Sequence, residues 1–174
     1  NRGKLEQNET INGVKVYRYN RFSPIFDFLK PFVNLTDIIQ SYLLVRKLDL
    51  IYDFDFSIVR NMKVGVGARL ALKAKPVIYV LSSITKFLDY KKLNEFKGHY
   101  ISNLIRWFYH NKITLGQDVY FEKVLLRISS LNVVFSKNMI NQVNELLKID
   151  SNKIKLITPG VDSNRFVKKE NIVV

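Results

Sequence analysis

The sequence predicts an α/β fold, in which a mostly parallel sheet carries helices on both faces. Residues 77–81 form a continuous apolar run, as expected for a strand that is buried on both sides, and residues 131–135 are predicted to be another short buried strand. Stretches of helical length separate these strands from each other and from a further predicted strand at 154–157. This alternation is typical of a Rossmann-like, doubly wound sheet.

Before the 77–81 strand, the pattern predicts a strand, a helix, a second strand and a second helix. Asn12-Gly13 is a turn signal, and the alternating residues 14–19 after it read as the first strand. Ser57 is expected to cap the second helix. The remaining predicted elements are a helix from Asn34 or Thr36 to about Arg46, a strand over 50–56 and a helix over 58–73.

After the 77–81 strand, residues 84–130 are expected to be mostly helical, with breaks near Gly98 and Gly116. Ser136 directly follows the 131–135 strand, where it is suited to cap a helix that reaches about Leu147. A last strand is predicted to open at 171–174.

The charge is strongly positive. Lys and Arg total 28 against 15 acidic residues, which gives a net charge of +13 over 174 residues. Such a field favours anionic partners, namely lipid headgroups, nucleic acid or phosphorylated substrates, although a solvated Lys-rich surface accounts for it equally well. The chain has no cysteine, which excludes disulfides, thiolate metal sites and cysteine nucleophiles.

Candidate ligand-binding segments follow from the fold class. In open α/β sheets, ligands bind beyond the carboxyl ends of the strands. The polar segments expected there are 53–57, 82–86, 136–137 and 158–162.

One ordered set of motifs points to a family. The strand ending in Ser136, a helix, and then Thr158-Pro159-Gly160-Val161-Asp162 with Phe166 follow one another over about 40 residues. This set resembles the end of the N-terminal, acceptor-side (subfamily 4-like) domain of group 1 (family 4) glycosyltransferases with the GT-B fold. More weakly, 49–52 resembles a "DxIH" strand of that family and 75–80 its "xPxVxT" strand.

The resemblance implies a partial GT-B N-terminal domain at 1–167, truncated at both ends, with 168–174 opening the C-terminal nucleotide-sugar-binding domain. The whole protein would then be a glycosyltransferase of the hexosyltransferase type. It would transfer a sugar from a nucleotide-sugar to a glycan or lipid-linked acceptor, without a cofactor. The family's Glu-x7-Glu motif does not occur in this chain, so the chain alone is expected to be inactive. The implied location is the cytoplasm, with peripheral binding to the inner membrane face as an option.

The resemblance also suggests substrate-binding residues. Ser82 stands where the family often has a histidine, and serine cannot shuttle protons near neutral pH, so no catalytic residue is assigned. Helix capping and turn formation are the structural alternatives for these side chains. The candidates are Ser82, Ser83, Ser136, Lys137, Gly160 and Asp162.

Three further sequence patterns can each be given a functional or a structural explanation. Gly65-x-Gly67 is better explained by small residues in a helix that packs closely on the sheet than by a phosphate loop. His99 and His110 lack a third ligand at a useful spacing, so no metal site is expected. Residues 98–112 combine aromatic side chains with cations, which suits either a helix at a membrane interface or an amphipathic helix with its aromatics in the core.

Two other function classes stay open. The charge and the aromatics near Lys and Arg would also suit a basic nucleic-acid-binding module, although the cations are dispersed and no fingerprint of such a module appears. A non-catalytic glycosyltransferase-like remnant is the third reading, because Ser82 replaces the family histidine.

Overall fold

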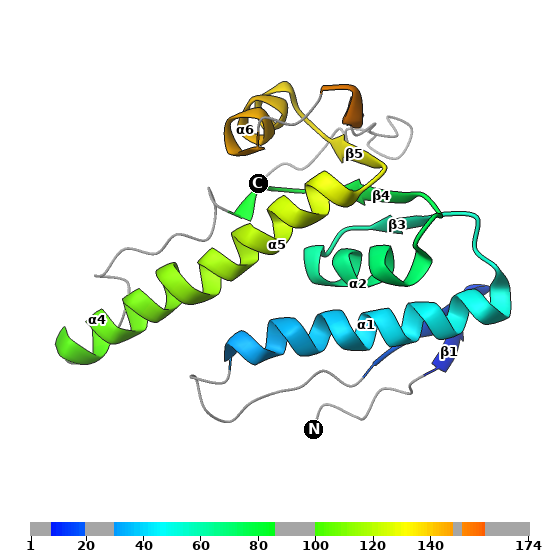
Figure 1. Ribbon diagram of the computed structural model, residues 1–174, viewed down its shortest axis with the longest axis horizontal. Coiled ribbons are helices and arrows are strands. Elements are labelled where there is room, and N and C mark those ends of the chain that lie inside the picture. Colours follow the sequence, from blue (N-terminus) through cyan, green and yellow to red (C-terminus); the bar gives the residue numbers. More distant parts are fainter. Residues whose placement is uncertain (1–7, 20–29, 86–99, 148–150, 159–174) are drawn as a thin grey trace, which may run out of the picture.

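The computed structural model describes residues 8–19, 30–85, 100–147 and 151–158 (Figure 1). Four parallel strands form its main sheet, in the order in which they occur along the chain. They alternate with helices, which confirms the predicted Rossmann-like α/β fold. The strands are β3 (Ser57–Val59), β4 (Val77–Val80), β5 (Leu131–Val134) and β6 (Ile154–Leu156).

The helices pack in layers against this sheet. The first, α1, packs on α2, which in turn contacts β3 and β4 as well as α5, while α6 contacts β5 and β6. None of the described helices is long and apolar enough to cross a membrane. Their bounds are α1 (Lys30–Tyr52), α2 (Met62–Leu72), α4 (Tyr100–Phe108), α5 (Leu115–Ile128) and α6 (Lys137–Leu147), with a 3-10 turn, η4, at Ser151–Lys153.

The predicted first strand belongs to a separate hairpin. β1 (Asn8–Ile11) and β2 (Val14–Tyr17) pair antiparallel, and the two turn residues Asn12 and Gly13 have φ of 49° and 80°. Positive φ at both positions is what a two-residue hairpin turn requires. The turn and the strand are confirmed, and the strand lies outside the parallel sheet.

The predicted strand over 50–56 is wrong, because Leu50 to Tyr52 are the last turn of α1. No glycine or proline interrupts the chain between Phe32 and Tyr52, so the helix continues. It ends at Asp53, whose φ of 47° turns the backbone away and whose N–H donates to the Asp49 carbonyl at 2.8 Å. The resemblance of 49–52 to a strand motif is therefore not matched by the local structure.

Ser57 is a strand residue and not a helix cap. Its N–H donates to the Pro76 carbonyl at 3.0 Å, beside β4. The cap of α2 is Asn61, whose Oδ1 accepts hydrogen bonds from the N–H groups of Lys63 at 2.9 Å and Val64 at 3.3 Å. The second helix accordingly begins at Met62, later than predicted.

The helical region after β4 has a different interruption from the predicted one. A π-helix, η3 (Tyr109–Thr114), lies between α4 and α5. The three helices follow one another without a gap in the sequence. Gly116 lies inside α5, so the break predicted there is wrong, and Gly98 lies outside the described residues. The strands at 77–81, 131–135 and 154–157 and the helix ending at Leu147 are confirmed, whereas 171–174 lies outside the described residues.

Gly65 and Gly67 serve close packing of their helix, as predicted, but their nearest neighbours lie mainly on other helices and not on the sheet. A Cβ on Gly65 would overlap the side chain of Leu125 on α5. A Cβ on Gly67 would meet Ser41 Oγ and lie 2.6 Å from the carbonyl oxygen of Ile38 on α1. These glycines let α2 approach both neighbouring helices closely, which closes the core around fully buried side chains, among them Val77, Leu81, Leu125, Leu126, Val134 and Val143.

Candidate functional site

The carboxyl edge of the sheet brings two predicted segments to neighbouring strands. Val80 on β4 lies opposite Val133 on β5, and the Leu81 N–H extends this ladder to the Val133 carbonyl at 2.9 Å. Ser82 and Ser136 each follow their strand by two residues, so they leave the sheet at the same edge. The predicted segment 53–57 is wrong as part of this edge, because it precedes β3 and therefore lies at the amino end.

The loop after β4 presents two hydroxyl groups on a fixed backbone. Ser82 and Ser83 are exposed, while the flanking Leu81 and Ile84 are only 1% and 2% exposed. The apolar neighbours anchor the loop in the core, so the serine side chains point toward solvent without the loop having to open. This is the arrangement expected of a hydroxyl pair that is available for contact with a ligand.

A buried carboxylate holds the far end of this loop. Glu122 on α5 is 1% exposed, and its Oε2 accepts a hydrogen bond from the Thr85 N–H at 3.1 Å, while its Oε1 accepts one from the Thr85 hydroxyl at 3.3 Å. The carboxylate thereby connects α5 with the segment that follows β4. Buried carboxylates are retained only where hydrogen bonds satisfy them, which the Thr85 donors do.

Tyr79, on β4, shares that carboxylate. Burial raises the pKa of the Tyr79 hydroxyl well above its ordinary value near 10, and the negative charge of Glu122 and its hydrogen bond with the phenol raise the pKa further. Tyr79 is 3% exposed and stays protonated over the physiological range.

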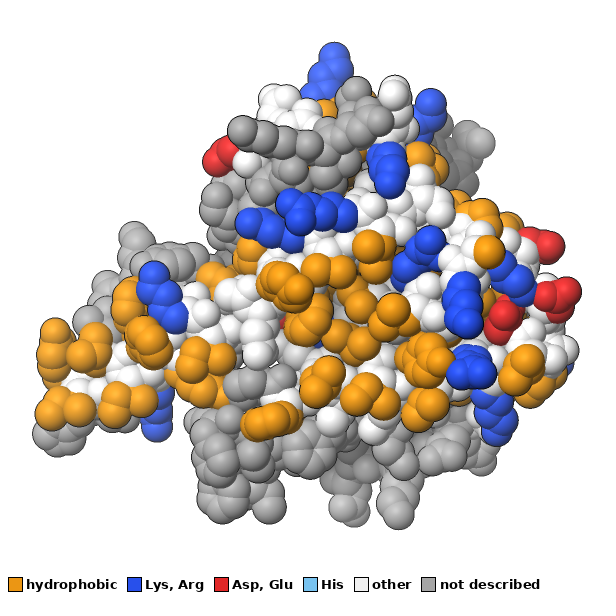
Figure 2. All heavy atoms as spheres, in the orientation of Figure 1, with side chains coloured by type: hydrophobic (Ala, Val, Ile, Leu, Met, Phe, Trp, Pro, Cys, Tyr) orange, Lys and Arg blue, Asp and Glu red, His pale blue; other side chains and the backbone are white. Residues whose placement is uncertain are grey.

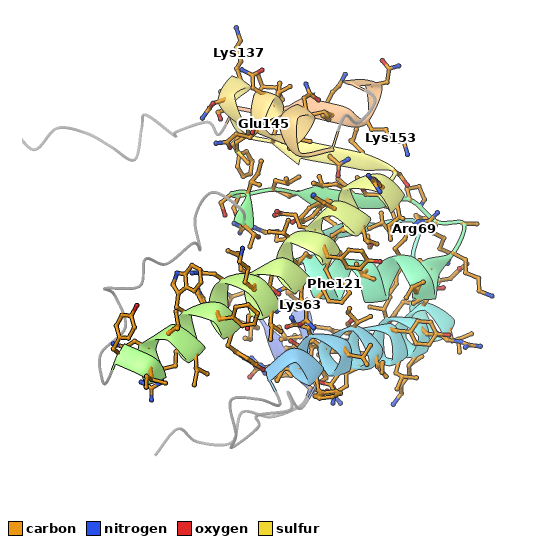
Figure 3. All side chains as sticks on the ribbon, turned by 60° about the vertical axis from the view of Figure 1, so that its left-hand side comes forward. Lys63, Arg69, Phe121, Lys137, Glu145 and Lys153 are labelled. Atoms are coloured by element: carbon orange, nitrogen blue, oxygen red, sulfur yellow. The ribbon has the colours of Figure 1, made fainter. Side chains whose placement is uncertain are left out.

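Ser136 caps α6 at the neighbouring strand end. Its Oγ accepts a hydrogen bond from the Met139 N–H at 3.2 Å, which confirms the predicted cap. Lys137 follows it at the start of α6, is exposed, and points away from the body of the protein (Figure 3). The N-terminal end of a helix and a lysine together favour an anionic group at this place.

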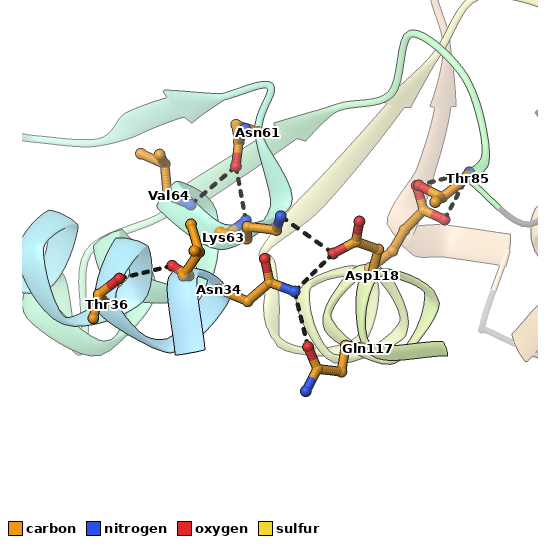
Figure 4. Close-up of polar contacts among 10 residues, drawn as sticks. Asn34, Thr36, Asn61, Lys63, Val64, Thr85, Gln117 and Asp118 are labelled. Atoms are coloured by element: carbon orange, nitrogen blue, oxygen red, sulfur yellow. Dashed lines mark hydrogen bonds and ion pairs between the residues drawn. The ribbon is translucent and has the colours of Figure 1, made fainter. Parts of the chain in front are cut away.

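A second polar cluster ties three helices together below the ends of β3 and β4 (Figure 4). The Lys63 ammonium on α2 lies 3.2 Å from Asp118 Oδ1 on α5. Asn34 on α1 donates to the same Asp118 oxygen and to Gln117 Oε1, each at 3.1 Å. The bonds join α1, α2 and α5 beside the carboxyl edge, and they have a structural role.

Two acidic residues before β3 form an ion-pair cluster with Lys75 at the opposite, amino edge. Lys75 Nζ lies 2.8 Å from Asp49 Oδ1 and 2.6 Å from Asp53 Oδ1. The hydrogen bonds that Lys75 donates to Asp49 and Asp53 raise the pKa of Lys75, and the bond that Asp53 accepts from Lys75 lowers the pKa of Asp53. This cluster fixes the turn between α1 and β3.

The site as a whole combines predicted and unpredicted residues. Ser82, Ser83, Ser136 and Lys137 come together at one edge, whereas Gly160 and Asp162 lie outside the described residues. Glu122, Lys63 and Asp118 were not predicted. A signal for Glu122 exists in the sequence, since it shares the buried face of α5 with Leu115 and Leu125 at helical spacing.

Across the residues whose positions the structure gives, no group of three or more His, Cys, Asp or Glu side chains could hold a metal ion. Comparison of the chain with models of protein families, with curated proteins and with solved structures found no match.

Proposed function

We propose that the chain is the acceptor-side part of a glycosyltransferase that moves a sugar from a nucleotide-sugar to a glycan or lipid-linked acceptor. The ordered motifs that resemble group 1 GT-B glycosyltransferases are the basis of this proposal, and the Rossmann-like sheet is compatible with it. The observation that carries it is the exposure of Ser82–Ser83 and Ser136–Lys137 at the ends of adjacent parallel strands.

The chemistry of the proposed transfer fits these groups. Serine hydroxyls donate and accept hydrogen bonds, so Ser82 and Ser83 suit the hydroxyl groups of a sugar acceptor. Lys137 and the start of α6 supply positive charge, which suits a phosphate of the donor or of a lipid-linked acceptor. No proton shuttle is assigned to these residues, so their contribution would be the positioning of the acceptor.

The test is an assay of the full-length gene product against a panel of nucleotide-sugars, with release of the nucleoside diphosphate as the readout. Membrane and polysaccharide extracts serve as acceptors. Turnover with one donor, dependent on an added extract, is the expected result. The double variant Ser82→Ala/Ser83→Ala should lower kcat/KM by about tenfold or more, because two acceptor hydrogen bonds are lost.

The matched control is Thr10→Ala, which removes an exposed hydroxyl group on β1. It should leave kcat/KM unchanged. Absence of turnover with every donor would contradict the proposal. Salt-dependent binding to any DNA duplex in that case would favour the basic nucleic-acid-binding module instead.

A further inference from the structure

The helix α4 presents its apolar side to solvent. Ile101 is 72% exposed and Ile105 is 63% exposed, and Tyr100, Leu104 and Phe108 are exposed as well. At 100° per residue these five side chains occupy one continuous arc, and the polar residues Asn103 and Arg106 lie outside it. A helix on the surface of a water-soluble domain normally turns its apolar arc inward. Here the arc is turned outward.

The position of α4 makes this arc accessible. It forms the end that projects from the body of the protein in Figure 1, and Figure 2 shows apolar side chains gathered there with Lys and Arg side chains beside them. A pocket of about 400 Å³ opens on the same helix, lined by Leu104, Ile105, Trp107, Phe108 and Tyr109. The interpretation of 98–112 as a helix with its aromatics in the core is therefore wrong for α4.

The charge around the arc indicates what it contacts. The sequence has no acidic residue between Glu95 and Asp118, while Arg106 and Lys112 are exposed in that stretch. The whole chain carries +13. Two copies of such a chain would bring like charges together, which disfavours self-association through this helix. Aliphatic side chains such as Ile101 and Ile105 offer nothing to the phosphates of a nucleic acid.

We propose that α4 docks on the surface of an anionic phospholipid bilayer. The apolar arc enters the boundary between headgroups and acyl chains, and the cations beside it contact the lipid phosphates. Aromatic side chains are favoured at this depth, since one side of the ring meets hydrocarbon and the other meets water. The proposal does not depend on the glycosyltransferase reading, because it uses none of the residues at the carboxyl edge of the sheet.

The test is sedimentation of the chain with phosphatidylcholine vesicles that contain or lack phosphatidylglycerol. The protein should pellet only with the anionic vesicles, and the double variant Ile101→Asp/Ile105→Asp should lower the partition coefficient by about tenfold or more. The control variant is Leu50→Asp/Leu70→Asp, which adds the same two charges at exposed apolar positions on α1 and α2. It should bind like the original chain, apart from the small effect of net charge.

Trp107, the single tryptophan of the chain, gives a second readout. Its fluorescence should shift to the blue and become less accessible to acrylamide when anionic vesicles are added. Circular dichroism of both variants checks that they stay folded. Three results would overturn the proposal: no binding to anionic vesicles, equal binding by the two double variants, or a vesicle-free oligomer that only the α4 variant dissociates.

Discussion

The backbone N–H of Thr85 donates a hydrogen bond to the Glu122 carboxylate at 3.1 Å, although the two residues lie 37 positions apart. Tyr79 on β4 is affected by the same carboxylate, which helps to raise the pKa of its hydroxyl group. Three elements thus meet at one buried charge, namely β4, the loop that bears Ser82, and α5. This contact fixes the Thr85 end of the loop, while the buried side chains of Leu81 and Ile84 anchor the rest of it in the core.

Glu122→Ala should lower the free energy of unfolding by about 2–4 kcal/mol, since each buried donor left without an acceptor costs about 1–3 kcal/mol. Chemical denaturation with urea measures the change. The matched variant Glu145→Ala removes an exposed carboxylate from α6 and should change stability by no more than about 0.5 kcal/mol. Equal effects of the two substitutions would mean that Glu122 does not hold the loop.

The raised pKa of Tyr79 predicts that the folded protein loses stability at high pH. Because its pKa is raised in the folded state, the stabilisation is complete below the unfolded pKa near 10 and is lost as the pH rises toward the folded value. The unfolding midpoint should therefore decrease above about pH 10. In Tyr79→Phe this alkaline decrease should become smaller. Thermal unfolding of both variants is measured at a series of pH values, with Tyr120→Phe as the control because Tyr120 is exposed on α5. The difference between the two variants gives the contribution of Tyr79 to the alkaline decrease.

Two glycine substitutions should have opposite signs. Gly67→Ala should destabilise the fold by about 1–3 kcal/mol, because the new methyl group meets backbone atoms of α1 that cannot move aside. Gly116→Ala should stabilise it by about 0.5–1 kcal/mol, since no atom lies within 4 Å of an added Cβ in α5. Differential scanning calorimetry of the pair checks both signs. A stabilising Gly67→Ala would refute the close contact between α1 and α2.

The cap of α6 can be separated from ligand binding by two substitutions at Ser136. Ser136→Ala should cost about 1 kcal/mol of stability, because the Met139 N–H loses its acceptor. Ser136→Asp keeps an acceptor there and should retain the stability. It also places a negative charge beside Lys137, so it should weaken binding of an anionic substrate. If Asp and Ala destabilise equally, the hydrogen bond to Met139 is not the source of the stability.

The strands of the sheet could be predicted because their sequences are unambiguous. The apolar run at 77–81 and the mostly apolar segment 131–135 are too short for core helices and contain several β-branched residues, and Ser136 marks the start of the next helix. The segment 50–56 was ambiguous, because the same aromatic and aliphatic residues suit a strand or a helix end. The helix ends at Asp53, where φ is positive and the carboxylate pairs with Lys75, which lies 22 positions away in the sequence.

The candidate site could be predicted only in part. Topology alone brings Ser82 and Ser136 to one edge, so the fold class was sufficient for these residues. The contact between Glu122 and Thr85 depends on how α5 crosses the sheet, and no local pattern specifies that angle. The exposure of the apolar arc of α4 could not be predicted either. Amphipathic periodicity gives the width of an apolar arc, but it does not say whether the arc faces the core or the solvent.

The most direct test of the account compares two lysines at opposite edges of the sheet. Lys137 follows β5 at the carboxyl edge, and Lys153 precedes β6 at the amino edge (Figure 3). In the nucleotide-sugar assay, Lys137→Glu should raise the KM for the phosphate-bearing substrate by about tenfold, and Lys153→Glu should leave it unchanged. Equal KM values for the two variants, or a larger effect at Lys153, would contradict substrate binding at the carboxyl edge.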